Sequence, residues 1–158
     1  MSRAASRHLS RRAALQVLYA SDLGGASGGA ALSIDEVFTR VAASFDLPES
    51  ARGFARELVR GVDAERPALD ERIAAHTRNW RVARMAAVDR NVLRLAAWEL
   101  LHTDTPAEVV IDEAVELARD FGTERSAAFV NGVIDALARD RSERGEAVGQ
   151  VAGVEGEP

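Results

Sequence analysis

Apolar side chains recur along this chain at the three- and four-residue spacing of amphipathic helices, and no stretch alternates strictly as a half-buried strand does. The first such pattern predicts a helix over residues 6–23, followed by a glycine-rich loop. The broadest pattern runs from Val88 to Leu100 and covers too much of the helix circumference for a surface helix. It therefore predicts a buried central helix in an all-α protein.

Capping residues and prolines locate three more helices before the central one. Ser33, with Glu36 three residues later, forms the capping-box pattern that begins a helix. A proline suits the first turn of a helix, because no intrahelical hydrogen bond is lost there. Helices are therefore predicted over residues 48–61 and 67–76, each of which opens with a proline.

Two helices follow the central one. Residues 105–108, Thr-Pro-Ala-Glu, combine an N-cap threonine, a proline at the first helical position and a capping-box glutamate. Gly122 suits the left-handed position that ends this helix, and Thr123 can cap the last one. The seven helices predict a single compact all-α domain over residues 1–143. Periodicity is then lost, and residues 144–158 are predicted to form a disordered acidic tail.

Charge and composition narrow the classes of function. The 158-residue chain has a net charge of −5 at pH 7, which argues against a protein coated with basic residues. Its first 21 residues nevertheless hold four arginines and no acid. The lack of cysteine excludes disulfides and cysteine-based zinc sites. No run of about 18 apolar residues exists, so we expect no membrane association and a cytoplasmic location.

The sequence motifs of catalysis and cofactor binding are absent. The three histidines lie in separate segments without H-x-x-H spacing, and there is no G-x-S-x-G, Walker or G-x-G-x-x-G pattern. Asp112, Glu116 and Asp120 are spaced by four and line one helix face. That face either binds a divalent ion or is solvated, and solvated acidic faces are the commoner case. We therefore expect no enzyme activity, no cofactor and no metal.

The start of the first predicted helix has the composition of an RNA-binding surface. Arg7 and Arg11 are four residues apart and share one helix face, with Arg12 beside them. Gln16 and Tyr19 continue along that face. Arginines for phosphates and an aromatic ring for a base are a usual combination for binding single-stranded RNA. A solvated basic helix start with Tyr19 half-buried is the alternative, and composition does not separate the two.

Four motifs in a fixed order cover most of residues 7–140. They are Arg-Arg-Ala-Ala-Leu-Gln-Val-Leu-Tyr at 11–19, Val-Asp-Arg-Asn-Val-Leu-Arg-Leu at 88–95 with Trp-Glu-Leu at 98–100, Val-Ile-Asp-Glu-Ala-Val-Glu-Leu-Ala at 110–118, and Phe-Val-Asn-Gly-Val at 129–133. Together they resemble the bacterial transcription antitermination factor NusB family. The resemblance implies an all-helical fold of two small bundles that binds the boxA element of nascent RNA. It also implies a partner, the small-subunit ribosomal protein NusE, in the antitermination complex with RNA polymerase.

The resemblance further implies which residues face RNA and which face the partner. The RNA-facing set lies on the first helix and around the start of the last: Arg7, Arg11, Arg12, Gln16, Tyr19, Arg125 and Phe129. Asp89 matches an acidic position that the family uses towards NusE. Two arginines depart from the family pattern. Arg12 stands where some relatives have an acid, and Arg125 stands where a relative can carry one, which strengthens attraction to RNA.

Two other functions remain open on this sequence. One is a self-associating protein-interaction module, whose homodimer hides the arginines instead of offering them to RNA. The other is an RNA-binding portion of a ribosomal RNA methyltransferase, whose N-terminal domain is related, although this chain holds no methyl-transfer domain. Helix-turn-helix DNA binding is disfavoured, because the last two helices carry acids on their exposed faces.

Overall fold

The computed structural model describes residues 1–26, 32–77 and 81–145 of the 158. Within these ranges it contains six α-helices, one 3-10 turn and no strand, which confirms the all-α class. The elements are α1 (Arg3–Ala26), α2 (Ile34–Ala42), α3 (Glu49–Ala74), η1 (Val82–Arg84), α4 (Ala87–His102), α5 (Ala107–Phe121) and α6 (Ser126–Glu143). None of these helices is both long and apolar enough to cross a membrane. All but two residues of the predicted acidic tail lie outside the described residues.

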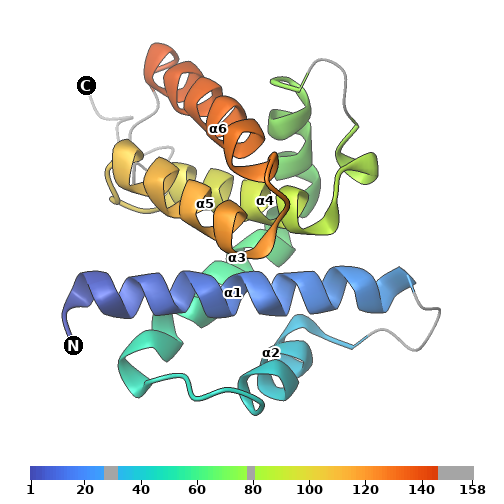
Figure 1. Ribbon diagram of the computed structural model, residues 1–158, viewed down its shortest axis with the longest axis vertical. Helices are drawn as coiled ribbons and strands as arrows, with labels where there is room; N and C mark the ends of the chain where they lie inside the picture. Colours follow the sequence, from blue (N-terminus) through green and yellow to red (C-terminus); the bar gives the residue numbers. More distant parts are fainter. Residues whose placement is uncertain (27–31, 78–80, 146–158) are drawn as a thin grey trace, which may run out of the picture.

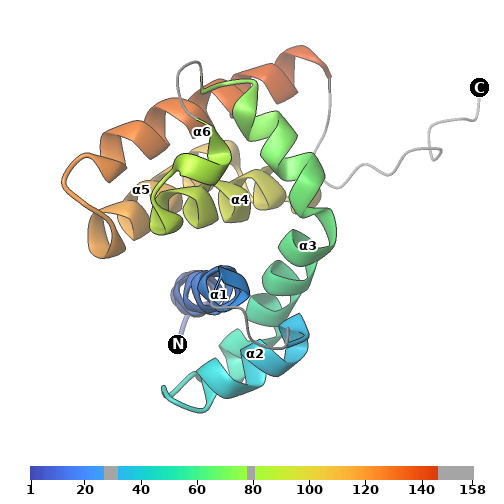
Figure 2. The same cartoon turned by 90° about the vertical axis from the view of Figure 1, so that its right-hand side faces the viewer.

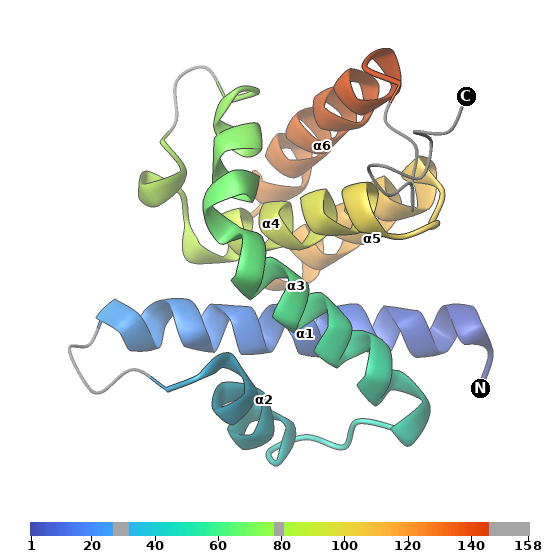
Figure 3. The same ribbon diagram turned by 180° about the vertical axis from the view of Figure 1, so that it is seen from behind.

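The helices form two small bundles on either side of α1. Figure 1 shows α1 running across the molecule, with α2 on one side and α4, α5 and α6 on the other. Figure 3 shows that α3 crosses α1 and reaches both groups. The first half of α3 packs with α1 and α2, and the second half packs with α4 and α6. This arrangement confirms the two bundles that the family resemblance implied.

Helix α3 joins two helices that the sequence predicted separately, over 48–61 and 67–76. Glu65 alone has a non-helical backbone within it, with φ −115° and ψ 18°. The cause is Pro67, two residues later, because a proline lacks the amide hydrogen of the helical ladder and its ring clashes with the carbonyl four residues before it, which bends the helix. The predicted seven helices are thus six, since this proline bends the chain and lets each half of α3 serve a different bundle.

Helix α4 is the central helix that the sequence predicted. Every residue from 91 to 100 is buried. Three of these buried side chains are polar or charged: Asn91, Arg94 and Glu99. Burying such groups is costly unless they are hydrogen-bonded or paired. Their partners come from α1 and α3, so α4 ties the two bundles together through polar contacts as well as apolar packing.

Capping signals predicted both the position and the hydrogen bonds of the start of α2, but only the position of the start of α5. Ser33 Oγ accepts a hydrogen bond from the Glu36 N–H at 3.1 Å, and the Ser33 N–H donates to Glu36 Oε1 at 2.8 Å, so the predicted capping box is confirmed. Helix α5 begins close to its predicted start, but no side chain caps it. The Thr105 hydroxyl lies instead 3.0 Å from the Thr103 hydroxyl, so the capping box predicted there is wrong.

The connector between α5 and α6 depends on a glycine for space. Gly122 ends α5 as predicted, but with an extended φ of −101° and ψ of −159°, so the predicted left-handed conformation is wrong. A Cβ there would lie 2.4 Å from Ser126 Oγ and 2.8 Å from the Ala118 carbonyl oxygen. Thr123 donates its N–H to Ser126 Oγ at 3.0 Å, and its hydroxyl accepts the N–H of Arg125 at 3.3 Å. Glycine therefore permits a close turn that holds Arg125 at the start of α6.

Candidate nucleic-acid interface

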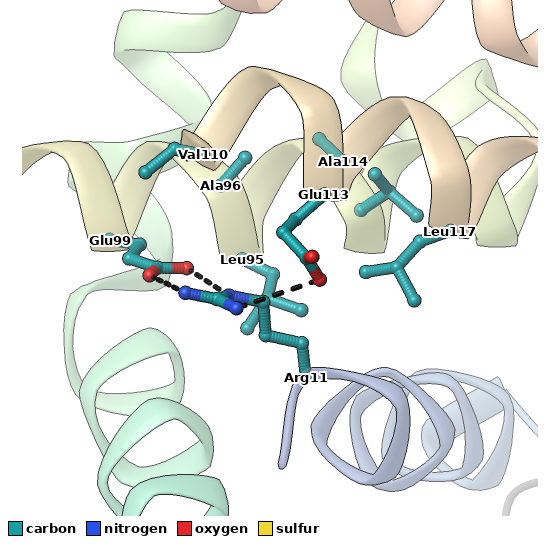
Figure 4. Close-up of a pocket in the computed structure, with 9 residues that line it drawn as sticks. Arg11, Leu95, Ala96, Glu99, Val110, Glu113, Ala114 and Leu117 are labelled. Carbon is teal, nitrogen blue, oxygen red and sulfur yellow. Dashed lines mark hydrogen bonds and ion pairs between the residues drawn. The ribbon is translucent and has the colours of Figure 1, made fainter. Parts of the chain in front are cut away.

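Arg11 extends from α1 into the interior rather than into solvent. Its side chain is 5% exposed, and that of its main partner, Glu99 of α4, is 2% exposed. The guanidinium donates through Nε to Glu99 Oε1 at 2.8 Å and through Nη2 to Glu99 Oε2 at 2.5 Å. Figure 4 shows Glu113 of α5 directed towards the same guanidinium, with Nη1 3.5 Å from Glu113 Oε1. One arginine thereby joins three helices.

The two carboxylates offset the cost of burying the charge of Arg11. Burial alone disfavours the charged form and lowers the pKa of Arg11, but the hydrogen bonds and charge of Glu99, followed by those of Glu113, outweigh it and raise the pKa. The guanidinium is charged, and its N–H donors are bound to carboxylate oxygens of the protein. The space beside this pair has a volume of only about 10 Å³. No nucleotide fits there.

The structure therefore changes the role of Arg11 that the sequence predicted. Arg11 was expected to contact phosphates because it shares a helix face with Arg7. In the structure, its donors face Glu99 and Glu113, so its function is to hold α1 against α4 and α5. The arginines of α1 that reach solvent are Arg3, Arg7 and Arg12.

Arg7 is the arginine of this helix best placed for an anion. Its guanidinium carbon lies 3.9 Å from the ring centroid of Phe54 on α3, and the pair is a close cation–π contact. The stacked guanidinium is partly exposed, and no carboxylate pairs with it among the described residues. It borders two surface hollows of about 310 and 490 Å³, both of which Arg3 also lines. Arg7 is thus held in place by an aromatic ring while its N–H groups face solvent.

Arg12 is shared between α1 and the end of α5. Its Nη1 lies 2.9 Å from Asp120 Oδ2, and its guanidinium carbon lies 4.8 Å from the Phe121 ring centroid. Both charged side chains remain about a third exposed, at 35% and 39%. The charge of Arg12 is therefore partly neutralised, and the pair holds the end of α5 alongside α1.

Gln16 and Tyr19 lie in solvent further along α1. Both residues are exposed, and Tyr19 retains 38% of its surface. They are three residues apart and so lie on neighbouring positions of one helix face. The Tyr19 ring is therefore accessible from solvent, and its stacking on a base stays a prediction.

Arg125 and Phe129 lie on a different element, at the start of α6. Arg125 is exposed, whereas Phe129 is partly buried against the core. The Arg12–Asp120 pair fixes the end of α5 beside α1, and the connector that carries Arg125 leads from there to α6, away from α1 (Figures 1 and 2). Within the described ranges, no hydrogen bond, ion pair or ring contact links Phe129 to α1. The two halves of the predicted surface are therefore neighbours without being joined directly.

Asp89 lies at the opposite end of α4 from Glu99. It occupies the first turn of that helix and is partly buried. Its Oδ1 atom is buried and accepts no hydrogen bond within the described part of the chain. Ten residues of helix separate it from Glu99, a rise of about 15 Å. The predicted partner residue is therefore well separated from the arginines at the start of α1.

A second buried polar network lies beside Asp89, and sequence reasoning missed it. Asp22 near the end of α1 accepts hydrogen bonds from Arg90 at 2.7 Å and Asn91 at 2.9 Å, and Arg94 donates to Asp70 of α3 at 2.8 and 3.0 Å. Burial raises the pKa of Asp22, but these hydrogen bonds and the arginine charges outweigh it and lower the pKa. The available signal was the presence of charged residues inside the most apolar helix, since a buried charge requires a partner.

Comparisons with known proteins agree with this architecture. A model of the NusB family matches residues 8–139. The transcription antitermination protein NusB of Anaeromyxobacter dehalogenans strain 2CP-1 is 50% identical over 133 residues, covering 84% of this chain and 89% of that protein. The protein of the same name from Sorangium cellulosum strain So ce56 is 46% identical over 140 residues, covering 85% and 93%.

Solved structures give the same result at the level of the fold. The structure of T. maritima NusB matches with a TM-score of 0.75 and 34% identity, covering 85% of this chain and 91% of that one. A chain from the crystal structure of antitermination factors NusB and NusE in complex with dsRNA matches with a TM-score of 0.74 and 28% identity, covering 89% and 99%.

Proposed function

This chain belongs to the NusB family, and on that premise we propose that it is an RNA-binding transcription antitermination factor. With NusE, it binds the boxA element of nascent RNA and promotes processive transcription of ribosomal RNA operons by RNA polymerase. A similar chain has been solved with NusE and RNA, which supports this assignment. The proposal gives the chain no catalytic role and a cytoplasmic location.

The observation that carries the proposal is the stacked, solvent-facing guanidinium of Arg7. It provides a fixed cation on the same helix as the exposed Gln16 and Tyr19. Phosphates bind at Arg7 and Arg12, and bases stack on Tyr19. Arg125 and Phe129 extend the surface onto the start of α6. Arg11 supports this surface from beneath by holding α1 in place.

Titration of a boxA RNA over a series of salt concentrations tests the surface. Arg7→Gln should weaken binding and reduce the slope of log K against log salt by about 0.7, because one phosphate contact is lost. Phe129→Ala should lower affinity by roughly 1–3 kcal/mol with an unchanged slope, because stacking releases no counterions. Arg139→Gln is the matched control, since this exposed arginine pairs only within α6. Wild-type binding and slope in both test variants would show that the surface is misplaced.

The partner surface is tested separately at Asp89. Asp89→Asn keeps the shape of the side chain and removes its charge. It should weaken NusE binding measured by calorimetry and leave binding of RNA to the isolated chain unchanged. Loss of RNA binding with intact NusE binding would contradict the separation of the two surfaces.

A self-associating protein module is the second candidate function. The pairing of Arg11 and Arg12 with carboxylates favours it, because two of the four N-terminal arginines already have anionic partners. Light scattering with and without boxA RNA discriminates between the self-associating module and the RNA-binding antitermination factor. A homodimer whose mass is unaffected by RNA would support the module, whereas RNA binding by a monomer supports antitermination.

A further inference from the structure

His8, Glu113 and Glu116 form a mixed cluster of ligand-type side chains between α1 and α5. His8 Nδ1 lies 2.9 Å from Glu113 Oε1, and His8 Nε2 lies 3.7 Å from Glu116 Oε2. One ligand atom from each residue can be chosen so that all three lie within 4.8 Å of one another. Within the described ranges, this is the one group of three such residues that is close enough to share an ion.

The charge of the surrounding cluster is unbalanced. Arg11 is the single arginine in contact with it, and it is shared between Glu99 and Glu113. Glu116 contacts His8 and no arginine among the described residues, so the three carboxylates of Glu99, Glu113 and Glu116 share one guanidinium and one imidazole. A divalent cation between His8 and the two glutamates would supply positive charge that this cluster lacks.

We propose that His8, Glu113 and Glu116 bind a divalent transition metal of the zinc class, which ties α1 to α5. One imidazole nitrogen and two carboxylates are a ligand set that zinc accepts, with a water molecule in the fourth position. A soft or borderline ion is preferred over magnesium, because imidazole is a poor ligand for magnesium.

The site requires one carboxylate to change sides, because Glu113 faces His8 Nδ1 and Glu116 faces His8 Nε2, whereas a metal binds only one of these two nitrogens. Ligand atoms of a tetrahedral zinc ion lie about 3.3 Å apart, given metal–ligand distances of about 2.0 Å. Glu116 is 50% exposed, so its carboxylate is free to swing from the Nε2 side of His8 to the Nδ1 side, where Glu113 lies. Glu113 keeps its contact with Arg11, because a carboxylate has acceptor sites for both a guanidinium and a metal.

Metal titration of the full-length chain, first treated with a chelator, tests the proposal. Zinc should bind with a stoichiometry of one by calorimetry and raise the thermal unfolding midpoint, whereas the same concentration of magnesium should not. Cobalt should give the visible absorption of a tetrahedral or five-coordinate site. His8→Gln and Glu116→Gln should each reduce zinc affinity at least tenfold. If His8→Gln fails to fold, Glu116→Gln carries the test, because that side chain is half-exposed.

The other two histidines provide matched controls. His76 faces Asp140, and His102 faces Glu65, each across a single ion pair. His76→Gln and His102→Gln should leave zinc affinity within twofold of wild type. The proposal is overturned if zinc neither binds nor stabilises the chain, if His8→Gln and Glu116→Gln both bind zinc normally, or if the control variants lose affinity equally.

Discussion

Replacing Arg11 with alanine should destabilise the fold, because Glu99 would be left as a buried charge without its guanidinium. Glu99 is 1% exposed, and both of its oxygens accept hydrogen bonds from Arg11. Removing one partner of such a buried pair costs about 3–5 kcal/mol. For a chain of this size, that loss lowers the unfolding midpoint by roughly 6–20 °C.

Urea and thermal unfolding followed by circular dichroism measure this loss. Arg139→Ala is the control, because its exposed pair with Asp135 is expected to contribute at most about 0.5 kcal/mol. The double variant Arg11→Met with Glu99→Leu removes both charges and should recover most of the stability lost in Arg11→Ala. An Arg11→Ala protein within about 0.5 kcal/mol of wild type would refute a structural role for this ion pair.

Two further predictions concern the rest of the core. Because the pKa of Asp22 is lowered in the folded chain, its contribution to stability is present above the unfolded pKa and is lost as the pH falls below about 4. The free energy of unfolding in urea should therefore differ less between pH 7 and pH 3 in Asp22→Asn than in wild type. Gly61→Ala should cost about 1–3 kcal/mol in the same assay, because its Cβ would lie 2.2 Å from the Trp98 ring. Gly53→Ala, where the Cβ meets open space in the same helix, should instead stabilise by about 0.5–1 kcal/mol; equal effects at the two glycines would contradict the packing.

Local patterns predicted the helices well because their causes are local. The breadth of the apolar face identified α4, and Ser33 with Glu36 identified the start of α2 through bonds between residues three apart. Pro67 was misjudged for a tertiary reason. A proline can end a helix or bend it, and the packing of both halves of α3 against different bundles decides which occurs.

The candidate site was only partly predictable because long-range pairing decides the fate of each arginine. Helical spacing places Arg7 and Arg11 on one face, but it does not show that Glu99, 88 residues away, accepts one of them. The His8–Glu113 contact spans 105 residues, so no search for short ligand spacing finds it. Periodicity thus identifies the face of a helix, while the partners across the fold decide which of its charges remain available.

This division of roles leads to different RNA-binding behaviour for two arginines one helical turn apart. Arg7→Gln removes a cation that faces solvent, so it should reduce the salt dependence of RNA binding. Arg11→Ala removes a cation that is buried and paired with Glu99, so it should lower the fraction of chains competent to bind and reduce affinity by the same factor at every salt concentration. Parallel salt titrations of the two variants distinguish a change in slope from a uniform loss of affinity. The folded fraction of each variant is measured by circular dichroism under each condition. An equal fall in slope for both variants would mean that Arg11 leaves its carboxylates and contacts phosphate in the complex.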